Sequence, residues 1–358
     1  MTESRPAAAE PGLGVALACG PADALDLAVR AEQAGFDSVW TTEFSWRSAT
    51  VPMAAIAVAT SRITIGSAIA YALGRTPAVL AAEARDIDEL SDGRLILGLG
   101  SAQPSRIRDW LGIEPTDVTG RVAEVVEAVQ ALWHIGPEPV QYRGRHVSVT
   151  VGATPGAYPS RSARLPVLLA AVNRRMVHVA GAVADGLIAH PIVDGSALRE
   201  LMRPQLEAAA AAADRQQPPM VAAMLIAVVN DDEEAARRDA AAQIAFYAQH
   251  AAYAPLMSHY GFEPAAAGIR AAAADDWAAA VSAVTDTMVD RLAVAGPAQL
   301  VRRLVTERLA TRDCATLILH TPSMLMSDPA ARASGDPGRT YREHVGRLID
   351  AFGASAGR

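Results

Sequence analysis

Short apolar runs alternate with longer segments of helical periodicity along almost the whole of this 358-residue chain. Eight of the runs have the length and apolar character of buried strands. They are residues 13–18, 38–41, 63–69, 95–99, 167–172, 186–189, 221–229 and 316–320. Strands that are apolar on both faces are typical of a parallel sheet, because crossover helices cover both faces. Eight such units predict an α/β fold, a closed (β/α)8 TIM barrel with insertions.

The helical segments between the runs begin and end at recognisable signals. Proline stands at the first turn of two of them, at Pro21 and Pro77, and the first stops at Gly35. Further helices are expected at 51–60, 121–133, 176–183 and 197–213. A doubly wound open sheet is the alternative fold, but it would place a G-x-G-x-x-G turn after the first strand, where this chain has Ala18-Cys19-Gly20-Pro21. The barrel is therefore the favoured prediction.

Three stretches do not fit the barrel repeat. Residues 1–11 are polar and rich in alanine and proline, and we expect a loose tail before a single domain at 12–358. Residues 141–164 are predicted to form a small hairpin and loop, and residues 232–290 a long alanine-rich helical insert. Because barrel chemistry lies where strands pass into helices, an insert at that end would form a lid or a pocket wall.

Composition excludes several classes of function. The net charge is −7, all 32 basic residues are arginine, and no basic run is present, so we expect neither a nucleic-acid nor a membrane partner. The absence of lysine excludes Schiff-base chemistry and the P-loop. Cys19 and Cys314 cannot form a disulfide framework, and no signal peptide is recognisable, which predicts a cytoplasmic protein. The histidines show no metal-binding spacing, so no metal site is expected.

Polar residues at the ends of the predicted strands are the candidates for chemistry. Glu43 follows the second strand beside Phe44 and Trp46, where its carboxylate would be desolvated unless something pairs with it. His190 and His320 end the sixth and eighth strands, and imidazole is suited to proton transfer near neutral pH. For both histidines a hydrogen-bonded wall residue is the alternative interpretation.

Asn173, Arg174 and Arg175 join the fifth strand to the first turn of the next helix. Free N–H groups and the helix dipole favour a phosphate at such a position, although arginines there can also be ordinary solvated surface. The residue patterns alone therefore predict a barrel enzyme with a phosphate-bearing ligand.

Several stretches resemble the luciferase-like monooxygenase superfamily, and particularly its branch that uses the deazaflavin coenzyme F420. The resemblance is carried by residues 31–43 (AEQAGFDSVWTTE), 62–69 (RITIGSAI), 77–100, 180–186 (AGAVADG) and 294–297 (VAGP). These stretches follow the family's order over nearly the whole chain. The resemblance implies an F420-dependent oxidoreductase that moves a hydride between the deazaflavin and a small organic substrate.

The resemblance also implies the cofactor site. A cis peptide bond at Ala68–Ile69 would back the deazaflavin ring, and Glu43 would position the ring. The residues expected to contact the cofactor are Glu43, Ala68, Ile69, Thr76, Ser101, Ala171, Val172, Asn173 and Arg174, of which the last four match the family's phosphate-binding segment. Members of the family are usually homodimers, so a homodimer is expected.

Two departures from the family bear on the substrate. Sugar-phosphate dehydrogenases of this branch have a histidine beside the acid and a glutamate after the fourth strand, and the matching residues here are Phe44 and Gln103. Their substrate phosphate is held partly by lysine, which this chain lacks, so a sugar phosphate is rejected. Gln103, Glu43 and His190 are the catalytic candidates. The proton would be transferred by His190, by Glu43 or by solvent. A monooxygenase using flavin mononucleotide (FMN) and a flavin-binding barrel without turnover are the alternatives, and the substrate's identity stays open.

Overall fold

A computed structural model describes residues 11–156, 160–311, 313–323 and 337–353 of the chain, with the side chain of Pro337 excepted. Residues 1–10, which make up nearly all of the expected loose tail, lie outside the described residues.

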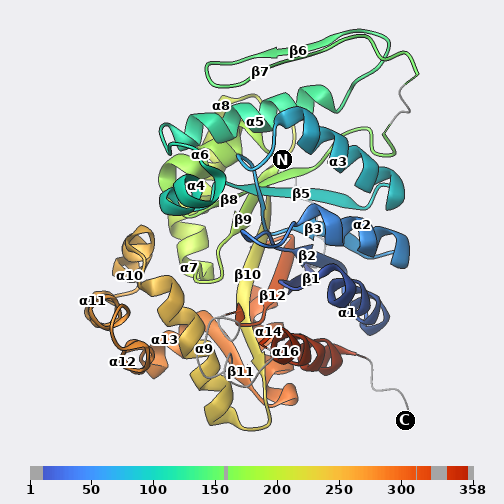
Figure 1. Ribbon diagram of the computed structural model, residues 1–358. Coiled ribbons are helices and arrows are strands. Elements are labelled where there is room, and N and C mark those ends of the chain that lie inside the picture. Colours follow the sequence, from blue (N-terminus) through green and yellow to red (C-terminus); the bar gives the residue numbers. More distant parts are fainter. Residues whose placement is uncertain (1–10, 157–159, 312, 324–336, 354–358) are drawn as a thin grey trace, which may run out of the picture.

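Eight parallel strands close into a barrel (Figure 1). In chain order they are β1 (Gly12–Leu17), β2 (Ser38–Thr41), β3 (Thr64–Ser67), β5 (Leu95–Gly100), β8 (Val167–Ala171), β9 (Gly186–Ala189), β10 (Met220–Val229) and β12 (Thr316–His320). The barrel closes between β9 and β10, where Met220 pairs with Gly186 and Ala223 with Ala189. The predicted (β/α)8 barrel is therefore confirmed, and every predicted strand is present to within a few residues.

Helices surround these strands and cover their outer faces (Figure 1). They include α1 (Pro21–Ala34), α2 (Thr50–Ala59), α3 (Pro77–Leu90), α4 (Pro104–Leu111), α5 (Val118–Leu132), α6 (Arg174–Val183), α7 (Gly195–Ala197), the π-helix η1 (Leu198–Met202), α8 (Arg203–Ala212), α14 (Ala298–Thr311) and α16 (Pro337–Phe352). The predicted signals are present: Pro21 and Pro77 occupy first turns, and Gly35 ends α1 in the left-handed conformation that glycine tolerates.

Two details of the sheet differ from the prediction. The third apolar run is interrupted after Ser67, and a short strand β4 (Ala70–Tyr71) resumes the pairing with β5. A further parallel strand, β11 (Ala293–Gly296), pairs with the carboxyl half of β10 and was not predicted. Its four small residues carry no periodicity that would distinguish a strand from the end of the preceding helix.

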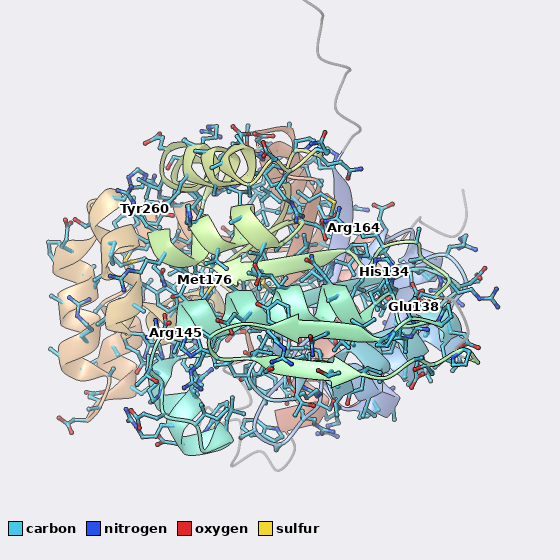
Figure 2. The ribbon with its side chains drawn as sticks, turned by 90° about the horizontal axis from the view of Figure 1, so that it is seen from above. His134, Glu138, Arg145, Arg164, Met176 and Tyr260 are labelled. Carbon is cyan, nitrogen blue, oxygen red and sulfur yellow. The ribbon has the colours of Figure 1, made fainter. Side chains whose placement is uncertain are left out.

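The two stretches outside the repeat have the predicted kinds of structure. Strands β6 (Val140–Arg143) and β7 (Ser148–Val151) form an antiparallel hairpin that lies outside the helices, with Arg145 at its turn (Figure 2). Between β10 and β11 the chain is helical, and the helices α10 to α12 stand apart from the barrel helices (Figure 1). These insert helices are α9 (Glu233–Ala248), η2 (Ala251–Tyr253), α10 (Ala254–His259), α11 (Glu263–Ala272), α12 (Trp277–Ser282) and α13 (Asp286–Leu292).

The interior of the barrel is filled by its own apolar cluster, separate from the larger core beneath the helices. Trp40 on β2 is the largest member, is 1% exposed, and donates its Nε1–H to the Ser38 Oγ at 2.9 Å. The indole fits because Gly66 on the neighbouring strand has no side chain, and a Cβ there would collide with the six-membered ring. Of the helices that the structure describes, none has the length and apolar character needed to cross a membrane.

We expect Gly66→Ala to lower the free energy of unfolding by about 2 kcal/mol, because the rigid Trp40 ring cannot yield to the added methyl group. Gly152→Ala is the matched control, since a Cβ at Gly152 meets no atom within 4 Å. Urea unfolding followed by tryptophan fluorescence measures both changes. Equal stabilities of the two variants would contradict this packing of the barrel interior.

Candidate active site

Glu43 follows β2 and fastens the segment that comes after β3. Its backbone N–H donates to the Ile69 carbonyl at 3.0 Å, and its Oε2 accepts the Tyr71 N–H at 2.6 Å. Glu43 therefore holds the β4 side of the short interruption between β3 and β4, while Thr41 and Thr42 bond the backbone of Ala68 on the β3 side. The Ala68–Ile69 peptide bond within this interruption is cis, as expected from the family resemblance.

Arg75 neutralises the Glu43 carboxylate. Its Nη1 and Nη2 lie 3.0 Å and 2.7 Å from the two carboxylate oxygens of Glu43, and its Nε pairs with the Glu83 Oε2 at 2.9 Å. The side chains of Glu43 and Arg75 are only 11% and 13% exposed. Burial acts to lower the pKa of Arg75, but the bonds and charges of Glu43 and Glu83 outweigh burial and raise it. The pairing partner that desolvation of Glu43 requires is therefore Arg75.

Ile69 forms an apolar wall at the mouth of the barrel. It is half-buried and packs against the interior cluster that contains Ala68, Leu168 and Ile188. Gly100, at the end of β5, makes room for it, because a Cβ on Gly100 would collide with the Ile69 side chain. The wall is thus fixed from below by the barrel and from the side by Glu43.

A cluster of histidine and tyrosine side chains lies across the mouth. The Nε2 atom of His190, just after β9, is 3.0 Å from the Tyr253 hydroxyl, and the Nε2 atom of His320, at the end of β12, is 3.1 Å from the Tyr247 hydroxyl. The ring centroids of His190 and Tyr247 are 4.4 Å apart. Both tyrosines belong to the insert, so the insert covers the carboxyl ends of β9 and β12.

Burial keeps the groups of this cluster uncharged. It lowers the pKa of His190 to about 3, with His320 and His250 acting in the same direction, and lowers that of His320 to about 4. It also raises the pKa of Tyr253 to about 12, although Arg106 and Gln103 act in the opposite direction. Both histidines are therefore neutral at physiological pH.

Gln103 is joined to this cluster rather than standing alone. It is the N-cap residue of α4, and its side chain lies close enough to the Tyr253 hydroxyl to act on its pKa, which it lowers against the larger effect of burial. Ser101, two residues earlier, donates its hydroxyl to the Ala102 carbonyl at 3.0 Å. The structure thus brings Gln103 and His190 together through one tyrosine.

The insert is fixed to the barrel beside His190. The Arg291 Nε lies 2.9 Å from the Asp194 Oδ2, and the Arg291 guanidinium stacks on the Tyr260 ring at 4.3 Å. The Tyr260 hydroxyl donates to the Ile192 carbonyl at 2.9 Å. Tyr260 belongs to the insert, and Figure 2 shows where it lies. This clamp sets the position of Tyr253 relative to His190.

The segment predicted to bind a phosphate, Ala171 to Arg174, joins the end of β8 to the start of α6. The Asn173 Oδ1 caps the helix by accepting the Met176 N–H at 3.0 Å, while Arg174 and Arg175 are exposed. A groove of about 850 Å³ opens beside these arginines. Ala171 is buried and Val172 half-buried below them, so the segment presents backbone N–H groups and positive charge at its upper end. Thr76 likewise caps α3, by accepting the Val79 N–H.

Residues 5–312 match the family model described as luciferase-like monooxygenase. The chain belongs to the luciferase-like monooxygenase family. A protein of unknown function from Mycobacterium tuberculosis is 31% identical over 297 residues, which cover 80% of this chain and 86% of the relative. A putative coenzyme F420-dependent oxidoreductase from the same organism is 32% identical over 176 residues, which cover 46% and 50% of the two chains.

Solved structures of the same fold include a protein that depends on coenzyme F420 and a protein in complex with FMN. The coenzyme F420-dependent tetrahydromethanopterin reductase from Methanopyrus kandleri superimposes with a TM-score of 0.76 at 21% identity, covering 96% of this chain and all of that one. The oxygenating constituent of 3,6-diketocamphane monooxygenase from Pseudomonas putida, in complex with FMN, gives 0.62 at 18% identity, with 95% and 99% covered. Together the relatives support an oxidoreductase with a flavin or deazaflavin cofactor.

In this luciferase-like chain the predicted residues Glu43, Ile69 and His190 lie at the carboxyl ends of the barrel strands, whereas Tyr247 and Tyr253 were not predicted from the sequence. Both lie in the alanine-rich insert, where no residue pattern indicates which face turns toward the barrel. Arg75 and Arg106 fall within the loops that follow the third and fourth predicted strands, but their roles were not predicted. Within the described ranges, no three His, Cys, Asp or Glu residues are grouped as metal ligands.

We expect acid to destabilise the folded chain partly through His320. In the unfolded chain this histidine gains a proton below its ordinary pKa of 6.5, whereas in the folded chain it stays neutral down to about pH 4. The free energy of unfolding therefore falls as the pH drops through this window, by about 2 kcal/mol at pH 5 for this one group. Urea unfolding at pH 7 and pH 5 measures the loss. His320→Gln should lose less by about that amount, and an equal loss would show that His320 titrates normally.

Proposed function

We propose that this chain is a coenzyme F420-dependent oxidoreductase that transfers a hydride between the deazaflavin and a small organic substrate. The proposal rests on the side chains at the mouth of the barrel. There Ile69 forms an apolar wall, and His190 and Tyr253 belong to a neutral polar cluster. The relative named as a putative F420-dependent oxidoreductase supports the choice of deazaflavin.

The residues at the mouth fit a flavin-type group. Among the buried polar atoms that have no hydrogen-bond partner within the described residues are three beside the histidine and tyrosine cluster, namely the His320 Nδ1, the Thr321 Oγ1 and the His250 Nε2. Buried polar atoms normally have partners, so these atoms are available to the polar edge of a planar heterocycle. The wall of Ile69 suits the ring face, and the N-terminus of α6 with Arg174 suits a phosphate.

Each part of the chain has a distinct task in this proposal. When bound, the reduced deazaflavin supplies two electrons as a hydride. Glu43, neutralised by Arg75, keeps Ile69 in place and leaves no free carboxylate beside the ring. The insert, clamped by Asp194 and Arg291, excludes water from the carboxyl ends of β9 and β12.

We expect the purified chain to bind oxidised F420 and to bind FMN much more weakly, as measured by fluorescence titration with each compound separately. Selective binding of FMN would replace the proposal with an FMN-dependent monooxygenase. Binding of neither compound would contradict the proposed function altogether.

If Glu43 holds the wall against which the ring lies, Glu43→Gln should weaken F420 binding by roughly tenfold, equivalent to about 1.4 kcal/mol. The amide cannot neutralise Arg75, so the segment after β3 loses its anchor. Glu127→Gln on α5 is the control, because Glu127 is paired with Tyr142 of the outer hairpin. An unchanged F420 affinity in Glu43→Gln would remove Glu43 from the site.

We further propose that the chain works as a homodimer. Val51 and Val58 on one face of α2 are 56% and 65% exposed, and Val79 and Leu90 on one face of the adjacent α3 are 48% and 47% exposed. Apolar residues gathered on one surface are typical of an interface. Sedimentation velocity should show a dimer for the wild type and a shift toward monomer for Val58→Glu, and a monomeric wild type would contradict this proposal.

A further inference from the structure

Tyr253, from the insert, is the meeting point of two of the predicted catalytic residues. We propose that the Tyr253 hydroxyl gives the substrate its proton, and that His190 is the positioning residue that holds this hydroxyl in place. The inference rests on the proposed function only for the supply of the two electrons.

The position of Tyr253 places its hydroxyl over the barrel mouth. Gln103 follows β5 and His190 follows β9, and these strands lie on either side of β8 in the barrel. The Tyr253 ring is 4.6 Å from the His190 ring and 6.1 Å from that of Tyr247, which in turn bonds His320 at the end of β12. The residue is half-buried, so its hydroxyl is shielded but not sealed from a ligand.

The hydrogen bonds around Tyr253 orient its proton. The His190 Nδ1 accepts the Ile192 N–H at 3.4 Å, so the neutral ring carries its proton on Nε2 and donates it to the Tyr253 Oη at 3.0 Å. Because the Tyr253 oxygen accepts this N–H, the O–H of Tyr253 is left to point at a ligand.

The same contacts exclude the other predicted proton donors. The Nε2–H of His190 is directed at Tyr253, and its Nδ1 is an acceptor. The Glu43 carboxylate is bound by Arg75 and by the Tyr71 N–H. Compared with these two predicted candidates, Tyr253 has the proton that is free to move.

The surrounding charge favours an acceptor atom that becomes negative. The Arg106 guanidinium on α4 stacks on the Trp110 ring at 4.8 Å, and that ring lies 6.3 Å from the Tyr71 ring. Its charge acts to lower the pKa values of Tyr71 and Tyr253, against the larger effect of burial. The same positive charge stabilises an oxyanion on a substrate and disfavours a cationic imine. The substrate class that fits is thus a carbonyl compound, or an alkene conjugated to a carbonyl.

The proton step balances with the hydride that the proposed function supplies. As the carbonyl carbon, or the β-carbon of a conjugated alkene, forms a C–H bond with this hydride, the π electrons move to the carbonyl oxygen. The O–H bond of Tyr253 breaks and its proton forms a new O–H bond on that oxygen. The electron pair of the broken bond stays on the Tyr253 Oη, where His190 donates to it. Water returns a proton to Oη after the product leaves.

Binding of an oxyanion to the ligand-free chain tests the donor directly. We use 4-nitrophenolate, whose absorbance reports its charge. Tyr253→Phe removes only the hydroxyl, and we expect it to weaken binding by about tenfold or more. Tyr142→Phe is the matched control, because the Tyr142 hydroxyl bonds Glu127 in the outer hairpin. Equal affinity in wild type and Tyr253→Phe, or no binding by either, would overturn the assignment.

Turnover with reduced F420 and cyclohex-2-enone tests the catalytic step. We expect Tyr253→Phe to lower kcat by roughly 100-fold or more while the Kd for F420 changes less than about twofold, because general acids contribute this much. A kcat within about threefold of wild type would overturn the assignment. A wild-type chain that does not bind F420 would instead contradict the proposed function, and the oxyanion titration would still decide the role of Tyr253.

Two substitutions at His190 distinguish a role in positioning the Tyr253 hydroxyl from a role in packing alone. His190→Leu removes the donor to Tyr253, and His190→Gln returns an N–H group near the position of Nε2. We expect the leucine variant to weaken 4-nitrophenolate binding by a few-fold and the glutamine variant to restore most of it. Equal losses in the two variants would show that His190 only fills space.

Discussion

The hold of Glu43 on the segment after β3 is the interaction on which the mouth of this barrel depends. One residue uses its backbone N–H on Ile69, its carboxylate on the Tyr71 N–H, and the same carboxylate on Arg75. A buried carboxylate is costly unless it is paired and hydrogen-bonded, and here every part of it has a partner. Ile69 is fixed as a wall because of this arrangement.

The opposite side of the mouth depends on the insert. The clamp of Asp194, Arg291 and Tyr260 fixes the insert beside His190, and the bond between Tyr247 and His320 fixes it at the end of β12. The insert therefore supplies chemistry as well as cover, since its tyrosines complete hydrogen bonds begun by residues on β9 and β12. The two sides differ in character, because one presents an apolar face and the other an uncharged polar cluster.

The sequence predicted the fold well because its signals are local. Apolar runs, first-turn prolines and the stop at Gly35 each act within a few residues, so the strands and helices could be placed to within a few positions. The position of Glu43 was predicted from the end of the second apolar run, and its need for a partner from desolvation. Its partner could not be singled out, because the pairing with Arg75 depends on the path of the chain after β3.

The features that could not be predicted depend on contacts between residues that are far apart in the sequence. Tyr253 lies 63 residues from His190 along the chain, in an alanine-rich helical region whose faces look alike in sequence. The short strand β11 was missed because its pairing with β10, and not its composition, makes it a strand. The proximity of Gln103 to Tyr253 could not be predicted for the same reason, since only the folded chain brings the two residues together.

The most direct test of the account is a crystal structure of this chain with oxidised F420. We expect the deazaflavin ring to lie against Ile69 and the coenzyme's phosphate to lie at the start of α6, beside Asn173 and Arg174. The Tyr253 hydroxyl should face the open side of the ring. A ring bound away from Ile69, or a phosphate held elsewhere, would contradict the account.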